Sequence, residues 1–440
     1  MSDNHKVMKD KTGQAINETL REIRNVLMPR EYGTIYGFHI NSAESDPEDC
    51  VTYLEDAAGF TPAHMDYTND KFVWGSWRDA FFMPRPCMLK YDGTVDYYLD
   101  PLNYALKYEG GASDIADASY GGNAMMEWGQ NGKKIWYKIV PDANDNTSAS
   151  VYIADYQVDD DFVCWSFVNN QGDLVDHFYT PIYNGTLIDG KLRSISGKAY
   201  SDLIQGKTSA QEMTAAKANN PGTDVLWTTE TFADVTLINL LLILMAKSLD
   251  CQTAFGQGRC GQSSAASSML GTGTMNEKGL FWGDDVTTAG VKVFGMENWW
   301  GNQWRRYAGH IMVDYVQKFK MTYGIQDGST QDGYLTSTTA SDYAGYLTGA
   351  TGPNTNNYVK EMQFLAIGCF MTKTVGGTSV DSAHYWCDYW YQNSGLRYAI
   401  RGGACDSGAG GVGPFFVNLA HAPGGTVWFL GAAPSCKPLS

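Results

Sequence analysis

The sequence predicts an α+β fold in which short strands dominate and a few helices are added. Residues 34–40 and 71–74 alternate apolar and polar side chains, as half-buried strands do, and residues 133–140 and 150–156 look like further strands. The 440 residues include 48 glycines and 27 tyrosines but only 18% charged residues, which favours long loops with many aromatic contacts. One strong helix is predicted at residues 231–248.

The predicted helix at residues 231–248 has a recognisable beginning. Thr231 is a suitable N-cap, and Asp234 is an acidic residue in the first turn. Residues 237–246 are almost entirely apolar, but this run is shorter than the roughly 18 residues that a membrane span needs. We therefore expect a buried helix and no membrane insertion.

A second helix is predicted near the start of the chain, at residues 13–28. Its apolar residues are spaced by three and four, as in an amphipathic helix: Ile16, Leu20, Ile23 and Leu27. The helix is expected to end before Pro29. Such a helix can pack on its own domain or attach the chain to a larger particle, and the sequence leaves both roles open.

Charge and cysteine content restrict the partners and the compartment. The net charge of −16, with no basic run to offset it, opposes binding to nucleic acid or to anionic lipid. The polar start lacks the apolar segment of a secretory signal, so we expect a protein made in the cytoplasm. Nine scattered cysteines indicate neither a disulfide framework nor a zinc site. Cys251 and Cys260 flank a loop and could pair if oxidised, but reduced thiols are expected.

Three motifs that could indicate a cofactor do not meet its structural requirements. Residues 256–261 match G-x-G-x-x-G, but they follow a predicted helix, whereas a dinucleotide site needs this loop after a strand. Residues 142–153 begin like a calcium loop, yet Thr147 and Ile153 replace the required glycine and glutamate. The seven histidines are isolated. We therefore expect no cofactor, no metal and no catalytic residues.

The segment 401–436 combines a regular frame with unrelated side chains. If residues 415–420 form a strand, Phe415, Val417 and Leu419 share one face and Phe416 lies on the other. In the same way Trp428 and Leu430 are expected to point inward, whereas Val427 and Phe429 are expected to point outward. No single chemistry needs the outward set, which indicates a binding surface and is expected to form one exposed patch. The predicted ligand-binding residues are Ala404, Cys405, Asp406, Ser407, Gly410, Phe416, Ala420, His421, Gly424, Gly425, Val427, Phe429 and Cys436.

A tryptophan-rich segment at residues 293–310 precedes this frame. Trp299, Trp300 and Trp304 are large flat side chains that we expect in the core, and Gly301 permits a tight bend beside them.

Both segments carry a family resemblance. Residues 401–431, with Arg401-Gly-Gly, Gly413-Pro-Phe and Trp428, resemble the variable proteins of diversity-generating retroelements. The tryptophan segment resembles the Gly-Asn-x-Trp-Glu-Trp element of the formylglycine-generating-enzyme branch of the C-type lectin fold, although Arg305 replaces its acidic residue. The resemblance implies a C-type lectin fold for residues 172–440, with a variable region at about 401–436. Residues 1–30 would then be the N-terminal helix and residues 31–171 a β-rich region.

The resemblance also implies how the variable positions arose. In that family an error-prone reverse transcriptase changes template adenines, so asparagine and tyrosine codons become codons for other residues. Phe416 and Cys436 occupy positions where tyrosine would be expected. Positions where asparagine would be expected hold Ala404, Asp406, Ser407, Ala420, His421, Gly425, Val427 and Phe429.

The function implied by the resemblance is receptor binding by a phage or prophage tail protein, located in the virion. Its partners would be a bacterial surface protein or glycan and other tail proteins, and a homotrimer is possible. An alternative is a structural virion protein whose C-terminal domain forms an assembly interface. A third is an enzyme on the same fold, but Cys405 and Cys436 lie far apart, unlike the cysteine pair of the formylglycine-generating enzymes. The expectation is therefore a binding protein and not an enzyme.

Overall fold

The structure is a computed structural model that describes residues 33–220, 222, 226–321, 346–377, 386–408 and 411–439. The helix predicted at residues 13–28 and the predicted ligand-binding residue Gly410 lie outside the described residues. Strands account for 38% and helices for 11% of the structure, which confirms a β-rich α+β class.

A four-stranded antiparallel sheet forms the first part of the described chain. Its order is β2-β1-β10-β9, with β1 at Ile35–Ile40, β2 at Val51–Glu55, β9 at Trp136–Asp142 and β10 at Asp145–Ala154. The strands predicted at 34–40, 133–140 and 150–156 are therefore confirmed. Residues 141–149, between the last two predicted strands, are also mostly strand, because β9 and β10 continue to within two residues of each other.

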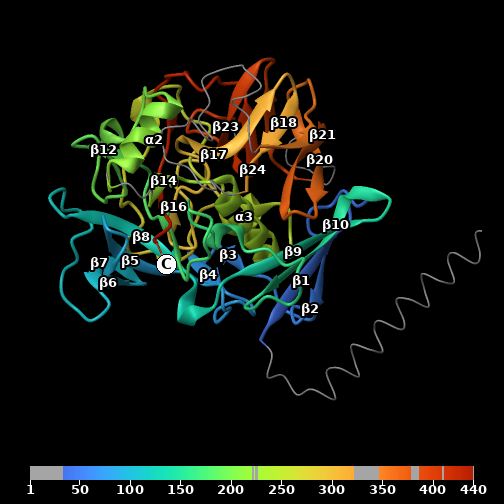
Figure 1. The fold of residues 1–440 in the computed structure, drawn as a ribbon, viewed down its shortest axis with the longest axis horizontal. Coiled ribbons are helices and arrows are strands. Elements are labelled where there is room, and N and C mark those ends of the chain that lie inside the picture. Colours follow the sequence, from blue (N-terminus) through green and yellow to red (C-terminus); the bar gives the residue numbers. More distant parts are fainter. Residues whose placement is uncertain are drawn as a thin grey trace, which may run out of the picture.

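A seven-stranded sheet joins strands from residues 85–229 with the C-terminal strand β26, in the order β14-β26-β11-β8-β5-β6-β7. Its strands are β5 (Arg85–Lys90), β6 (Val95–Asp100), β7 (Asn103–Lys107), β8 (Gly122–Trp128), β11 (Phe178–Pro181), β14 (Trp227–Thr229) and β26 (Pro434–Cys436). Figure 1 shows the C-terminal end beside β8 and β5. Strands from both sides of the expected division at residues 171 and 172 thus share one sheet.

A nine-stranded sheet contains most of the remaining strands, in the order β19-β18-β17-β23-β24-β22-β20-β21, with β25 beside β17. These are β17 (Trp304–Val313), β18 (Val316–Phe319), β19 (Leu347–Thr351), β20 (Asn357–Leu365), β21 (Cys369–Gly377), β22 (Tyr389–Gln392), β23 (Leu396–Gly402), β24 (Gly413–Leu419) and β25 (Leu430–Gly431). The sheet is nearly closed into a barrel. At its seam, the Gln317 side chain of β18 donates a 2.6 Å hydrogen bond to the Thr372 carbonyl of β21.

The helix α3 (Phe232–Ala246) lies between these layers (Figure 1) and is buried along its whole length. As predicted, Thr231 is its N-cap and accepts a hydrogen bond from the Asp234 amide at 3.1 Å. The helix ends at Lys247, whose φ of 51° is left-handed. Burial on every side explains why the apolar run has no polar face. Across the described residues, we find no helix with the length and apolar character needed to cross a membrane.

The smaller elements complete the fold. They are β3 (His64–Asp66), β4 (Lys71–Val73), β12 (Thr186–Ile188), β13 (Lys191–Arg193), β15 (Lys292–Val293), β16 (Met296–Glu297), η1 (Gln130–Gly132), η2 (Trp165–Phe167), η3 (Tyr200–Asp202), η4 (Ala266–Ser268), α2 (Ser209–Lys217) and α4 (Cys251–Phe255). Residues 256–261 follow α4, so the helix-then-loop order that argued against a dinucleotide site is confirmed. Cys251 and Cys260 are free thiols.

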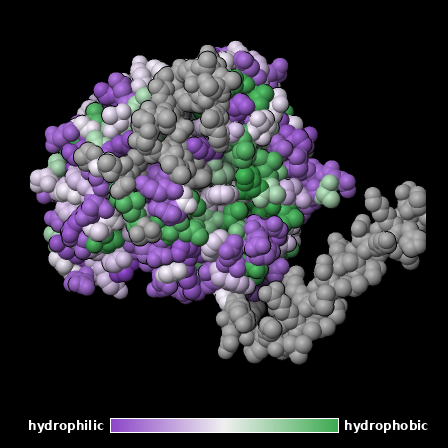
Figure 2. Space-filling model, viewed as in Figure 1, coloured by the Kyte–Doolittle hydropathy of each residue, from purple (hydrophilic) through white to green (hydrophobic). Residues whose placement is uncertain are grey.

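The surface in Figure 2 is mainly hydrophilic. Hydrophobic residues gather to the right of its centre, where Figure 1 labels β20 and β24. The three tryptophans predicted as core are buried: Trp299, Trp300 and Trp304.

Candidate functional site

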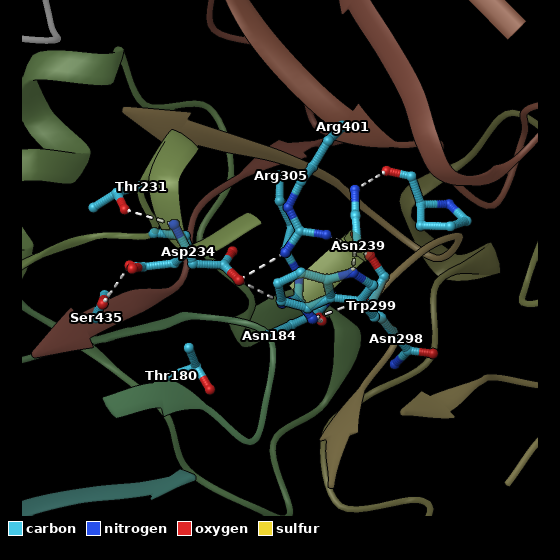
Figure 3. A network of polar contacts seen from close by, with 12 residues as sticks. Thr180, Asn184, Thr231, Asp234, Asn239, Asn298, Trp299, Arg305, Arg401 and Ser435 are labelled. Atoms are coloured by element: carbon cyan, nitrogen blue, oxygen red, sulfur yellow. Dashed lines mark hydrogen bonds and ion pairs between the residues drawn. The ribbon is translucent and has the colours of Figure 1, made fainter. Parts of the chain in front are cut away.

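The segment 401–436, which holds the predicted ligand-binding residues, contacts a buried network of charged and polar side chains (Figure 3). Arg401, on β23, donates hydrogen bonds of 2.6 Å to the Trp299 carbonyl and 2.7 Å to Oε1 of Glu230. Its guanidinium also lies over the Trp299 ring, 3.5 Å from the centroid, in a cation–π contact. Burial lowers the pKa of Arg401 to about 10, with Glu230 opposing the shift, so the side chain remains cationic at neutral pH.

Arg305, on β17, binds the same carboxylate from another side. Its Nη1 lies 3.4 Å from Oε1 of Glu230, and its Nη2 donates to Asn184 at 2.7 Å and to the Glu297 carbonyl at 2.6 Å. Arg305 stands where the resembled motif has an acidic residue. In the structure it pairs with Glu230, an acid from a distant segment of the chain. Sequence reasoning missed Glu230, because nothing near it indicates that two arginines would converge there.

Asn239, on α3, connects the tryptophan segment to β24. Its amide nitrogen donates to the Pro414 carbonyl at 2.7 Å, and its amide oxygen accepts from the Trp299 indole nitrogen at 3.0 Å (Figure 3). Both partners are buried. A single side chain thus holds the start of β24 against the core.

The predicted alternation along β24 is confirmed. Phe415 and Leu419 belong to the main core, with Val417 packed against it. Phe416 faces the opposite side, but that side is covered. The Phe416 ring meets Trp304 at a centroid distance of 4.5 Å and packs in a cluster with Leu430. The predicted face is therefore correct, whereas its expected exposure is wrong.

Four predicted ligand-binding residues are buried, so the expectation of one exposed patch is wrong for Ala404, Cys405, Phe416 and Cys436. Ala404 belongs to the cluster of Phe416, which β17 and β25 cover. Cys405 packs with Leu203 and Met269, whereas Cys436 packs with Trp227 in the seven-stranded sheet. The two cysteines thus lie in separate apolar clusters. Trp428, expected inward, is half-buried against the cluster of Cys405.

The other predicted residues that the structure describes are half-buried or exposed: Asp406, Ser407, Ala420, His421, Gly424, Gly425, Val427 and Phe429. The rings of His421 and Phe429 meet edge to face at 5.8 Å, and a Cβ on Gly425 would lie 3.9 Å from the Cβ of His421. Val427 and Phe429 pack against the cluster that contains Ala404. We refer to these eight residues as the outer set.

The outer set is held in place mainly through its main chain. The carbonyls of Ser407 and His421 accept hydrogen bonds from the amides of Gly261 (2.6 Å) and Tyr398 (2.9 Å). The Phe429 carbonyl accepts from the Trp304 amide at 3.0 Å, and the Gly425 carbonyl accepts from the Arg306 guanidinium. Main-chain bonds do not depend on the identity of the side chain at that position. These main-chain hydrogen bonds can therefore be retained while the side chains of the outer set change.

Of the three polar side chains in the outer set, those of Asp406 and Ser407 bond to the fold. The Asp406 carboxylate accepts from the Ser264 hydroxyl at 2.7 Å, and the Ser407 hydroxyl accepts from the Ala404 amide at 3.0 Å. Burial, followed by Arg306 and Arg397, lowers the pKa of His421, which is therefore neutral at pH 7. A neutral imidazole can both donate and accept a hydrogen bond.

Tyrosines outside the predicted region lie beside this surface. Tyr389 and Tyr391 of β22 meet at a centroid distance of 4.9 Å, and the Tyr391 ring stacks near Phe416 at 6.0 Å. Tyr391 is 39% exposed, and Tyr358 meets Tyr389 edge to face at 4.9 Å. The aromatic run at residues 386–391 was the available signal, but the sequence prediction began at residue 401.

No model of a known protein family matches this chain, and no curated protein sequence does either. Among the described residues, no three His, Cys, Asp or Glu side chains are grouped so that they could hold a metal ion.

Proposed function

We propose that this protein is a variable protein of a diversity-generating retroelement, with a C-type lectin fold in residues 172–440. In this proposal it is a phage or prophage tail component, and its outer set binds a protein or glycan on the bacterial surface. The observation that carries the proposal is the main-chain anchoring of the outer set. The carbonyls of Ser407, His421, Gly425 and Phe429 all bond to the frame.

The physical argument is a separation of roles. The frame is stabilised by buried groups such as Glu230, Arg305 and Arg401, whose replacement would leave an unpaired charge in the core. The outer set lies at the surface or is half-buried, so its substitution costs less stability than the removal of a buried charge. A surface of this kind can present different side chains on one backbone. His421 and Phe429 supply a polar and an aromatic contact, which are common in binding surfaces.

Adsorption of phage particles tests this function. Particles would carry the protein with His421, Val427 and Phe429 all replaced by alanine. Because these side chains are only half-buried, the variant should fold and assemble normally but lose adsorption to the host. A control variant replaces the exposed Lys71, Arg78 and Asp79 by alanine and should adsorb as the wild type does. Normal adsorption by the first variant would contradict receptor binding through the outer set.

Diversification is tested in the DNA beside the gene. We expect a near-copy of the codons for the variable region, differing at template adenines, next to a gene for a reverse transcriptase. Without such a repeat, the retroelement part of the proposal fails.

One observation favours an assembly interface, but it lies in the β-rich region before residue 172 and not in the C-terminal domain that the structural alternative names. β7 is the edge strand of its sheet, and three large apolar side chains are exposed on and beside it: Leu102 (71%), Leu106 (40%) and Tyr108 (62%). Such a group is typical of a surface that another protein covers. Loss of particle assembly in the His421, Val427 and Phe429 variant would favour this structural role for the C-terminal region.

A further inference from the structure

A surface hollow of about 510 Å³ lies between β12 and the segment that follows β13. This volume is in the range of small-molecule sites. Leu187, whose side chain is 38% exposed, gives the hollow an apolar side. The polar lining includes Lys198, Ser201 and Lys207, with Gln205 between them. The hollow therefore combines one apolar side with several hydrogen-bonding groups.

The charge in this hollow differs from that of the chain as a whole. The protein carries a net charge of −16, and many of its lysines pair with aspartates, as Lys90 does with Asp96 at 2.8 Å. Between described residues, no ion pair involves Lys198 or Lys207. The one acid in the lining is Asp202, whose carboxylate accepts from the Ala199 amide at 3.2 Å. The lining thus holds two lysines and one acid, an excess of positive charge that favours an anionic ligand.

The hollow is structurally continuous with the outer set. Arg306 donates to the Lys207 carbonyl at 2.9 Å through Nη1 and to the Gly425 carbonyl through Nη2. The Gly206 amide also donates to the Val427 carbonyl at 3.4 Å. Arg306 is itself buried and paired with Glu212 at 2.7 Å. One fixed guanidinium therefore joins the wall of the hollow to the backbone of the outer set.

We infer that this hollow binds an acidic sugar, with Lys198 and Lys207 holding its carboxylate. Leu187 would contact the apolar face of the pyranose ring, and Ser201 and Gln205 would bond its hydroxyls. The inference deepens the proposed function, because it adds a constant subsite for surface glycans beside a surface whose side chains vary. Its residues lie outside the region of predicted variation.

Binding of monosaccharides to the full chain tests the inference. The probes are D-galacturonic acid, D-galactose, which has the same ring without the carboxylate, and inorganic phosphate. We expect D-galacturonic acid to bind at least about tenfold more tightly than either of the others, since a carboxylate held by lysine adds a charge-assisted hydrogen bond. Ligand-observed NMR measures the three affinities. Phosphate binding as tight as that of galacturonate would overturn the assignment to a sugar.

A double variant assigns the binding to this hollow. Lys198→Gln with Lys207→Gln should weaken galacturonate binding about tenfold while the binding of galactose stays unchanged. Lys71→Gln, on the exposed part of β4, is the matched control and should bind galacturonate as the wild type does. Thermal unfolding of the variants checks that the fold is kept. Unchanged galacturonate binding by the folded double variant would overturn the inference.

The two proposals fail separately. The alanine variant of His421, Val427 and Phe429 should keep its affinity for galacturonate, because these residues do not line the hollow. If that variant adsorbs normally while the lysine variant loses galacturonate binding, receptor binding through the outer set fails and the subsite stands. If adsorption is lost in the alanine variant but no protein binds galacturonate, the subsite alone fails.

Discussion

The guanidinium of Arg401 lies 3.5 Å from the centroid of the Trp299 ring and donates a 2.6 Å hydrogen bond to the Trp299 carbonyl. This contact connects β23, which leads into the candidate surface, with the tryptophan-rich segment. Because Arg401 also pairs with Glu230, it links three segments that are distant in sequence. The geometry of the surface therefore depends on side chains beneath it.

Replacing Arg401 by glutamine should destabilise the protein strongly. Among the described residues, the change leaves Glu230 with only the longer Arg305 contact in a buried environment, and breaking such a pair costs about 3–5 kcal/mol. Urea unfolding followed by circular dichroism measures the difference. Arg397→Gln, at a half-buried position of the same strand, is the control and should cost much less. Equal losses in both variants would show that the buried pair does not hold the frame.

Replacing Asn239 by alanine should also destabilise the frame. The Pro414 carbonyl and the Trp299 indole nitrogen would both lose their partner in the core, at about 1–3 kcal/mol for each unsatisfied group. Urea unfolding measures the change in stability. Stability within about 0.5 kcal/mol of the wild type would contradict the role of Asn239.

Substitutions along β24 should separate buried from variable positions. Phe416→Asn removes a buried ring and should cost about 3–5 kcal/mol. Ala420→Asn, at the half-buried end of the same segment, should change stability by less than about 0.5 kcal/mol. Thermal unfolding compares the two proteins. A tolerated Phe416→Asn would show that this side chain is free to vary, contrary to its burial.

Cys436 provides a second comparison, because the family resemblance expects tyrosine there. The thiol is buried where β26 pairs with both β11 and β14, so Cys436→Tyr should overpack the core and cost about 1–3 kcal/mol. His421→Tyr, in the outer set, is the control and should be tolerated. If Cys436→Tyr is as stable as the wild type, the position can accept the expected tyrosine.

Acid should weaken the seam of the nine-stranded sheet. Burial lowers the pKa of His310 from 6.5 to about 4, and its ring contacts Tyr307 at 2.8 Å and Gln317 at 3.2 Å. Because the unfolded chain takes up the proton first, the stabilisation is complete above pH 6.5 and is lost as pH falls toward 4, by about 3 kcal/mol.

Denaturant unfolding at several pH values tests this. The His310→Gln variant should lose less stability than the wild type between pH 6.5 and 4, whatever its stability at neutral pH. Parallel curves for the two proteins would show that His310 does not cause the acid sensitivity.

The elements with strong local signals were predictable. Thr231 and the apolar run after it define α3, because capping and apolar composition act within a few residues. Alternation predicted the strand that contains Phe415 and Leu419, since the two-residue period is a property of the extended backbone. The sequence was also sufficient to predict that Trp299 is buried.

Only the tertiary structure decided which segments cover each face of a strand. The local sequence places Phe416 opposite Phe415, but β17 and β25 arrive from other segments and bury it. The pairing of Glu230 with Arg401 likewise joins residues 171 positions apart. Local sequence therefore determined the strands and their two faces. Burial and charge pairing depend on contacts between distant segments, and only the folded chain determined which side chains remain at the surface.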